Sequence, residues 1–166
     1  MIRLATIADL ESIMEIVGKA VKVMNDQGNF QWDHSYPLLE NYQGDLERED
    51  LYVYEKNEEV LGAIAISEKA HSEYHLIGWS SDEPALTLKR LVVSPFARKQ
   101  GIADAFFEFA EEYAIANQFY FIKTDTFSKN LAAQKLFARN GYTFVEERRE
   151  EAKNDSLYYF EKKLNA

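Results

Sequence analysis

Residues 88–103 read LKRLVVSPFARKQGIA, and this stretch decides the fold. The segment from Leu86 to Val93 is strongly strand-like, and Pro95 stops the strand because proline donates no ladder hydrogen bond. A basic turn follows, and an apolar helical pattern begins near Gly101. The stretch therefore predicts a strand, a basic turn and a helix in direct succession.

The turn before this helix has the features of an anion-binding site. Backbone N–H groups at a helix start are unpaired and carry the positive end of the helix dipole. Gly101 lets an anion approach the backbone without a Cβ in the way, and Arg98 and Lys99 add positive charge. The same spacing also fits a purely structural interpretation, in which the turn is a polar loop with a glycine at the start of the helix. Two familiar phosphate loops are excluded, because neither G-x-x-x-x-G-K-[ST] nor G-x-G-x-x-G is present.

The chain before this stretch reads as a strand, two helices and a hairpin. Residues 2–5 predict a short strand, after which Thr6 or Asp9 caps a helix that ends at residues 27–29. An aromatic loop over 30–37 leads to a short polar helix. The apolar face of the first helix consists of Leu10, Ile13, Met14, Val17, Val21 and Met24. The hairpin strands are 51–55 and 60–67, and 71–84 is irregular.

The chain after the stretch alternates between helix and strand. The helix from Gly101 is followed by a strand over 119–127 and a helix over 130–139 that Gly141 closes. Strands over 142–147 and 157–162 flank a charged turn, 148–156. The buried stripe of the first of these helices is Ile102, Ala105, Phe106, Phe109, Ala110 and Tyr113. The order β-α-α-β-β-β-α-β-α-β-β predicts one α/β domain over residues 1–166.

Composition limits the function classes. The 166 residues carry a net charge of −9 and 46% apolar residues, so the chain can bury a core. An acidic chain is a poor candidate for binding nucleic acid or anionic lipid. No cysteine is present, which excludes a disulfide and a cysteine nucleophile. Without a long apolar run or a signal peptide, we expect a cytoplasmic protein that binds no membrane.

Two blocks of the sequence resemble one protein family. Residues 98–103, RKQGIA, look like the R/Q-x-x-G-x-G/A motif of the GCN5-related N-acetyltransferases, the GNAT family. Residues 130–142, NLAAQKLFARNGY, resemble that family's N-x-x-A-x-x-L-Y-x-x-x-G-F block. The expected element order agrees over nearly the whole chain. The resemblance implies a mixed, mostly antiparallel sheet of about six or seven strands, with a splayed parallel pair and helices on both faces.

The resemblance also implies acetyl-CoA as co-substrate, held between the two splayed strands. In such proteins the cofactor arm runs along the strand before the turn, here Leu91, Val92 and Val93, and the Val93 amide stabilises the thioester oxyanion. Asn130 matches a residue that contacts the arm, although it also suits a helix N-cap. The pyrophosphate would lie on the turn formed by Arg98, Lys99, Gln100, Gly101, Ile102 and Ala103.

Phe137 departs from the family pattern while still matching a cofactor-contact position. Many members carry tyrosine there, placed to protonate the departing CoA thiolate, and phenylalanine has no proton to donate. A thiol pKa of about 8.5 makes thiolate a tolerable leaving group, so the missing acid need not abolish transfer. Tyr142, Tyr158 and Tyr159 are alternative acids, and the sequence selects none of them.

The general base is not fixed by any motif. Glu73, Asp33, His34 and Asp125 are candidates, acting directly or through water, and each also fits a structural polar role. None is assigned.

Two further groups of residues have candidate binding roles. His71 and His75 flank Glu73, but the segment lacks helical periodicity and the H-E-x-x-H order, so no metal site is expected. In the aromatic loop, Trp32 and Tyr36 are candidates for contact with the acceptor. A structural alternative fits the same loop: Trp32 packs it on the core of the protein.

The resemblance leads to one main function hypothesis with two rivals. We expect an N-acetyltransferase that moves acetyl from acetyl-CoA to a primary amine, directly and in a ternary complex, since no cysteine can carry the acyl group. The first rival is a non-catalytic acyl-CoA-binding or regulatory module on the same fold. The second is an interaction domain that binds no CoA. The sequence allows a homodimer but does not fix the oligomeric state.

Overall fold

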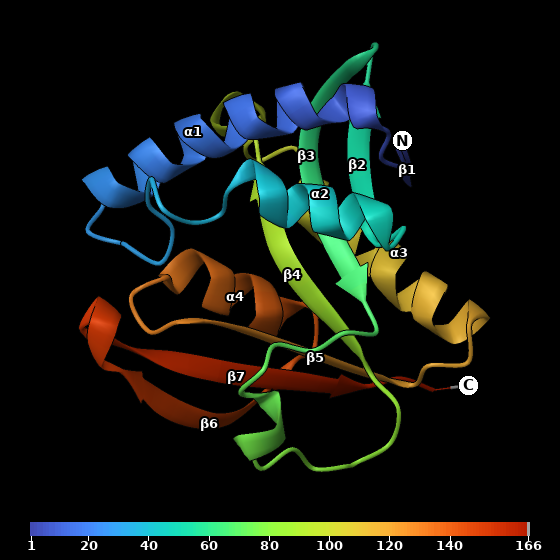
Figure 1. The fold of residues 1–166 in the computed structure, drawn as a ribbon. Helices are drawn as coiled ribbons and strands as arrows, with labels where there is room; N and C mark the ends of the chain where they lie inside the picture. Colours follow the sequence, from blue (N-terminus) through green and yellow to red (C-terminus); the bar gives the residue numbers. More distant parts are fainter. Residues whose placement is uncertain (166) are drawn as a thin grey trace. The chain divides into compact units, whose positions relative to one another are not determined.

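The computed structural model describes residues 1–165 (Figure 1). Its order of helices and strands is the predicted one. The helices are α1 (Leu10–Asp26), α2 (Leu39–Glu47), α3 (Ile102–Ala116) and α4 (Leu131–Arg139). The strands are β1 (Ile2–Leu4), β2 (Leu51–Lys56), β3 (Glu59–Ser67), β4 (Leu86–Val93), β5 (Phe121–Phe127), β6 (Thr143–Glu150) and β7 (Asp155–Lys163).

The strands hydrogen-bond in the order β1-β2-β3-β4-β5-β7-β6. The β4–β5 pair is parallel, and its pairing covers only Leu86 with Ile122 and Thr87 with Lys123. The pairs β1–β2, β2–β3, β5–β7 and β6–β7 are antiparallel. The predicted fold class, a mixed and mostly antiparallel sheet with one short parallel pair, is therefore confirmed.

The chain forms two compact units, and β4 and α3 each contribute to both. The first unit contains Met1–Ile66 and Lys89–Phe106. The second contains Ser67–Leu88 and the chain from Phe107 onward. The two units are described in turn.

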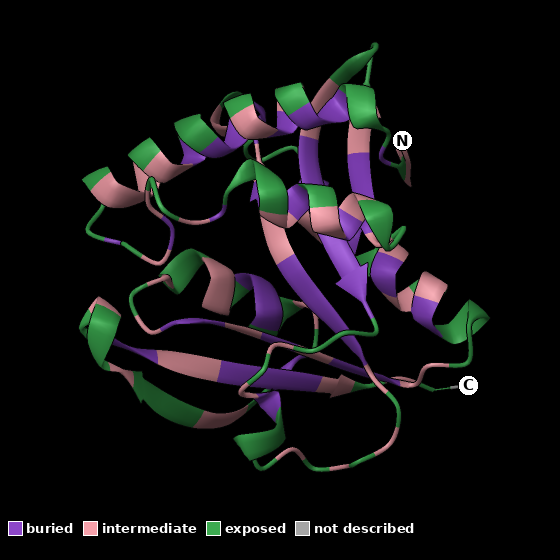
Figure 2. Cartoon of the chain, in the orientation of Figure 1, coloured by how far each residue is buried: buried purple, intermediate pink, exposed green. Residues whose placement is uncertain are grey.

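In the first unit, helices cover both faces of the sheet. Val53 and Ala63 are register partners, and with Val92 they belong to the core cluster that the buried face of α1 completes. Figure 2 shows this buried stripe along α1, with exposed residues on its opposite side. Tyr54 and Gly62 pair on the other face, where the ring of Phe106 from α3 lies 6.3 Å from that of Tyr54.

In the second unit, aromatic side chains cover both faces of β7. The Phe160 ring lies 5.0 Å from that of Phe137 in α4. On the other face the Tyr159 ring lies 5.7 Å from that of Tyr74 and 6.0 Å from that of Trp79. The segment 73–80 is tied to this face, since the backbone N–H of Gly78 donates to Glu146 at 2.7 Å.

Two sequence predictions need correction. The charged turn expected over 148–156 shrinks to Glu151–Lys153, because β6 continues through Arg148 and Arg149 as the last strand of the sheet. Charged side chains are common on such an edge. The stripe predicted for α3 omits Phe107 and Ala114, which are buried. Three of its six members are only half-buried: Ala105, Phe109 and Tyr113. In residues 1–165, no helix has the length and apolar character needed to cross a membrane.

Candidate functional site

The strand β4 leads into the predicted anion turn through a fixed corner. Ser94 is buried, and its backbone N–H donates to the carbonyl of Leu61 in β3 at 2.8 Å. Its hydroxyl caps the short helix Pro95–Ala97 by accepting from the N–H of Phe96 at 3.3 Å. The corner therefore fixes where the chain leaves the sheet, and it positions the turn that follows.

The turn has the backbone shape that an anion site requires. Lys99 and Gly101 both have left-handed backbone conformations, with φ of 64° and 75°. Arg98, Lys99 and Gln100 are exposed, and a Cβ on Gly101 would meet no atom within 4 Å. The 15-residue helix α3 starts directly afterwards, with the unpaired N–H groups of Ile102 and Ala103 in its first turn. This open, cationic helix start can hold a pyrophosphate group.

The predicted arm-binding residues lie on β4, immediately beyond a break in its regular geometry. Arg90 has a φ of 51°, which is unusual inside a strand. Val92 faces the core with α1, while Leu91 and Val93 are half-buried. The structure thus places Leu91, Val92 and Val93 in one strand that runs directly into the turn.

A buried charge network lies beside this part of β4. Arg90 donates from Nε to Asp45 Oδ2 of α2 at 2.7 Å and from Nη1 to the hydroxyl of Tyr36 at 3.0 Å. Arg48 donates from Nη2 to Asp45 Oδ1 at 2.7 Å. The side chain of Asp45 is fully buried. Tyr36, predicted to contact the acceptor, is therefore oriented by the network.

Lys89 is a candidate that the sequence analysis missed. It is 6% exposed, and no hydrogen bond or ion pair joins its side chain to any other residue in 1–165. Burial, and then the charge of Arg90, lowers the pKa of Lys89 to about 8. The available signal was a lysine within the apolar strand 86–93, a position that usually holds Val, Ile or Leu.

Asn130 and Phe137 belong to the second unit. Asn130 caps α4, since its Oδ1 accepts from the N–H of Ala133 at 3.1 Å, so the structural role that the sequence allowed is present. Phe137 is 5% exposed, and its ring lies 5.8 Å from that of Phe107. Contact of both residues with the cofactor stays a prediction.

The three tyrosines considered as general acids differ in environment. The hydroxyl of Tyr142 is the one fully buried side-chain polar atom without a partner in the described chain, and burial raises its pKa well above the usual value. Tyr159 donates to Glu73 at 3.0 Å, and burial raises its pKa as well. Tyr158 packs its ring 5.3 Å from that of Phe144. Two of the three thus hold their protons more tightly than free tyrosine does.

The four candidate bases are divided between the two units. In the second unit, Glu73 accepts from Tyr159, and Asp125 accepts from the Tyr74 hydroxyl at 2.6 Å. In the first unit, Asp33 accepts from the backbone N–H of Ser35 at 2.8 Å, and His34 is exposed. Three of the four have structural partners, and none is assigned as the base.

The aromatic loop and the histidines also occupy structural positions. Trp32 is buried in the core of the first unit, so the packing role that the sequence allowed is present. Its contact with the acceptor, like that of Tyr36, stays a prediction. The ring of His71 lies 5.5 Å from that of Tyr74, and Nδ1 of His75 lies 2.7 Å from the carbonyl of Ser72. Residues 1–165 contain no group of three or more His, Asp or Glu side chains that could hold a metal ion.

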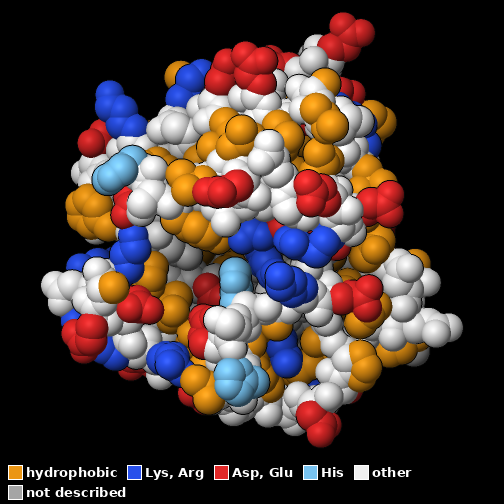
Figure 3. All heavy atoms as spheres, viewed as in Figure 1, with side chains coloured by type: hydrophobic (Ala, Val, Ile, Leu, Met, Phe, Trp, Pro, Cys, Tyr) orange, Lys and Arg blue, Asp and Glu red, His pale blue; other side chains and the backbone are white. Residues whose placement is uncertain are grey.

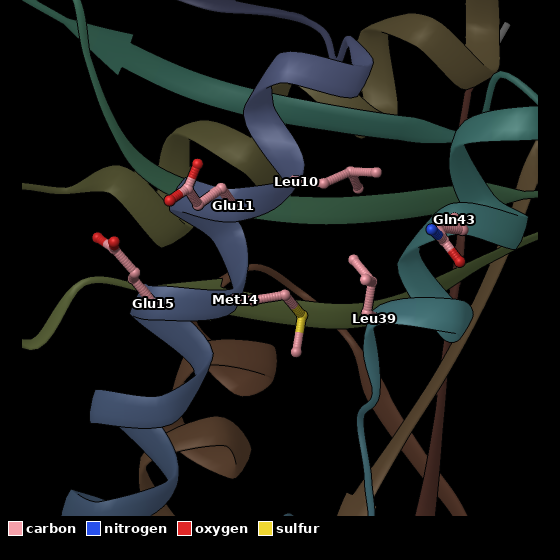
Figure 4. A pocket seen from close by; sticks show the side chains of 6 residues that line it. All are labelled: Leu10, Glu11, Met14, Glu15, Leu39 and Gln43. Carbon is pink, nitrogen blue, oxygen red and sulfur yellow. The ribbon is translucent and has the colours of Figure 1, made fainter.

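A shallow groove of about 550 Å³ lies between α1 and α2. Figure 4 shows Leu10 and Met14 of α1 facing Leu39 of α2 across it. Figure 3 shows carboxylates over the exposed faces of the two helices. The lining residues are Leu10, Glu11, Met14, Glu15, Leu39 and Gln43. None of the predicted site residues lines this groove.

Comparisons with known proteins agree on one family. The profile of the acetyltransferase (GNAT) family matches residues 18–142. A Staphylococcus aureus Mu50 protein assigned as an acetyltransferase has a crystal structure that is 31% identical, with 99% of both chains covered and a TM-score of 0.78. A GNAT-family acetyltransferase from Streptococcus agalactiae is 20% identical with a TM-score of 0.87, over 100% of this chain and 96% of that one, which bears on the fold alone.

A shorter match is to an acetyltransferase whose name states a substrate. Streptothricin acetyltransferase from Escherichia coli is 29% identical over 80 residues, 45% of this chain. The match spans 46% of that enzyme's length. With the family profile over residues 18–142 and the full-length similarity to the S. aureus structure, the chain belongs to the acetyltransferase (GNAT) family of acyl-CoA-dependent N-acetyltransferases.

Proposed function

We propose that the protein transfers an acetyl group from acetyl-CoA to a primary amine in a ternary complex. The observation that carries the proposal is the turn between β4 and α3. It combines left-handed backbone at Lys99 and Gly101, an exposed Arg98 and the start of a 15-residue helix. In an acidic protein, this local positive charge favours an anionic ligand such as the CoA pyrophosphate.

Within this proposal, residues 98–103 bind the pyrophosphate, and the backbone of Leu91, Val92 and Val93 pairs with the pantetheine arm. The Val93 amide donates to the thioester oxygen as negative charge develops there. One such donor typically contributes about 2.7–4 kcal/mol to transition-state stabilisation. Asn130 and Phe137 are assigned to the arm by their match to the family motif.

The absence of cysteine supports direct transfer from acetyl-CoA to the amine. With no cysteine in 166 residues, the usual thiolate carrier of an acyl group is absent. The amine would therefore attack the thioester carbonyl itself. Intersecting initial-velocity lines against both substrates are expected, and parallel lines would indicate an acyl-enzyme instead.

An amine panel, read by CoA thiol release and by the mass of the acetylated product, tests the proposal. The panel contains a small amine, a polyamine, an amine-bearing drug and a peptide with a free N-terminus. Streptothricin is included because a similar enzyme carries its name. We expect product with at least one class and thiol release in equal amount. Acetyl-CoA binding, shown by thermal stabilisation, without product from any amine would contradict transfer.

That last outcome is the signature of a second candidate, an acyl-CoA-binding module without catalysis. The observation that favours it is Phe137, which lacks the hydroxyl that many family members place near the thiolate. A protein that neither binds nor turns over acetyl-CoA would exclude both candidates and support an interaction domain.

We also propose a cytoplasmic location and a homodimeric assembly. The cytoplasmic location is consistent with the use of acetyl-CoA. Cell fractionation tests the location. Light scattering tests the assembly, and a mass equal to one chain would rule out the dimer.

A further inference from the structure

The side chain of Lys89 on β4 is nearly buried and has no hydrogen-bond or ion-pair partner among residues 1–165. We propose that its neutral amine is the general base that takes the proton from the acceptor ammonium. This inference rests on the proposed acetyl transfer, and it assigns the base that neither the sequence nor the family motif supplies.

The charges around Lys89 are already paired with one another. Arg90 lies next to it on β4, and Asp45, Arg48 and Asp50 act on it from α2 and the turn that follows. Asp45 accepts from both arginines, and Asp50 accepts from Arg48 Nε at 3.2 Å. Both carboxylates are thus bound to guanidinium groups. No carboxylate in residues 1–165 forms an ion pair with Lys89.

Burial and this pairing raise the neutral fraction of the amine, to roughly one molecule in ten at pH 7 for a pKa of about 8. Removing an ammonium from water penalises its charged form, which is why burial lowers the pKa of Lys89 to about 8. Among the described residues, the Tyr142 hydroxyl is the one polar side-chain atom that is both fully enclosed and without a partner. Lys89 Nζ also lacks a partner, so it is not fully enclosed. Lys89 Nζ therefore keeps a small contact with solvent, through which the proposal has the acceptor approach.

The position of Lys89 on the strand suits the reaction. It lies two residues before Leu91 and four before Val93, the residues to which we assign the cofactor arm and the oxyanion donor. With a regular strand rise of about 3.3 Å per residue, four residues correspond to about 13 Å between the Cα atoms of Lys89 and Val93, and the break at Arg90 changes this value locally. The flexible four-carbon stem of lysine covers part of that span, and the acceptor nitrogen and the thioester carbonyl would occupy the rest.

The proton and bond changes balance as follows. The acceptor ammonium gives one proton to Lys89 Nζ, and the resulting amine attacks the thioester carbonyl carbon. A C–N bond forms and the C–S bond breaks, with its electron pair leaving on CoA sulfur. The second proton from nitrogen neutralises the thiolate, and protonated Lys89 returns its proton to water. An amine pKa of about 10.4 leaves roughly one acceptor molecule in a thousand neutral at pH 7, so a base is needed.

The test compares Lys89→Met and Lys89→Arg with the wild-type protein, and with Lys22→Met as a control on an exposed α1 lysine. kcat/KM for the best amine is measured from about pH 6 to about pH 10, together with the Kd for acetyl-CoA. We expect both Lys89 variants to lose about 10²–10⁴-fold in kcat/KM at neutral pH with Kd unchanged. The control should match the wild type.

Three outcomes overturn the inference. The first is a Lys89→Met variant whose kcat/KM stays within a factor of about three of the wild-type value, with the same pH profile. If the variants do not fold, the pH dependence of trace labelling of wild-type Lys89 with acetic anhydride replaces them. The second overturning outcome is a labelling midpoint at the pH found for exposed lysines, instead of at about pH 8. Wild-type protein that acetylates no amine overturns the proposed function and this inference together, whereas an active wild type with an equally active Lys89→Met overturns the inference alone.

Discussion

Arg90 and Asp45 form a buried ion pair that joins β4 to α2 across 45 residues of sequence. Nε of Arg90 lies 2.7 Å from Oδ2 of Asp45, and the two side chains are 8% and 0% exposed. A second guanidinium, that of Arg48, binds the other carboxylate oxygen at 2.7 Å. One carboxylate therefore holds two arginines, and it leaves the neighbouring Lys89 without an anionic partner.

Asp45→Asn should destabilise the protein severely. The neutral amide removes the carboxylate that Arg90 and Arg48 share and leaves only Asp50 beside Arg48. Breaking a buried pair in this way typically costs about 3–5 kcal/mol. Urea denaturation at pH 7 measures the change. Asp26→Asn, at an exposed position of α1, is the control and should change little. Equal midpoints for the two variants would mean that the pair contributes nothing.

Gly101→Val should weaken acetyl-CoA binding at least about tenfold, a change of about 1.4 kcal/mol. The branched side chain occupies the space through which the pyrophosphate approaches, and it strains a residue with φ of 75°. Gly28→Val is a matched control, since Gly28 has φ of 81° and equally open surroundings in a turn outside the proposed site. Titration calorimetry gives both Kd values. If the two variants bind acetyl-CoA equally, the effect is only strain, and residues 98–101 do not bind the cofactor.

Gly62→Ala should cost roughly 1–3 kcal/mol of folding stability. A Cβ at this position in β3 would lie 2.8 Å from the Val92 carbonyl oxygen and 3.1 Å from the Phe106 ring, so β4 or α3 would have to shift. Gly18→Ala, on α1 with nothing within 4 Å, is the contrasting substitution and should gain about 0.5–1 kcal/mol. Thermal unfolding of both variants tests whether the two substitutions change folding stability in opposite directions.

Asp9 should make folding sensitive to acid. Its carboxylate accepts from Arg3 at 2.8 and 3.0 Å and from the Thr6 N–H at 2.7 Å, and the Arg3 hydrogen bonds hold its pKa below the usual value. Because the folded-state pKa lies below the unfolded one, this stabilisation is full above about pH 4 and is lost as pH falls through the folded value.

Asp9→Asn should therefore be less stable than wild type at pH 7 by about 1–3 kcal/mol, with the gap closing in acid. Urea midpoints at pH 7 and at acidic pH provide the measurement, with Glu11→Gln at an exposed position as control. A gap of constant size at all pH values would show that the charge of Asp9 plays no part.

Local signals explain which parts of the fold the sequence predicts correctly. The order of elements follows from hydrophobic periodicity and from residues that end helices, such as Gly141 with φ of 85°. The N-cap role of Asn130 is also local, because donor and acceptor are three residues apart. The single-domain reading of residues 1–166 stays a prediction.

Non-local packing explains what was missed. In α3, Phe106 packs on Tyr54 while the adjacent Phe107 packs on Phe137 and Tyr142, so no single 3.6-residue stripe describes its buried residues. The state of Lys89 depends on ion pairs that link positions 45 and 90, which no local pattern reveals. Glu73 and Asp125 remained unsorted for the same reason, since their partners Tyr159 and Tyr74 lie 86 and 51 residues away in sequence.

The measurement that tests the central claim most directly is the mass of an amine acceptor after incubation with the protein and acetyl-CoA carrying a trideuterated acetyl group. The account predicts that the acceptor gains one trideuterated acetyl on nitrogen, that free CoA appears in equal amount, and that Gly101→Val slows both at limiting acetyl-CoA. An acceptor of unchanged mass for every amine in the panel, with acetyl-CoA left intact, would contradict it.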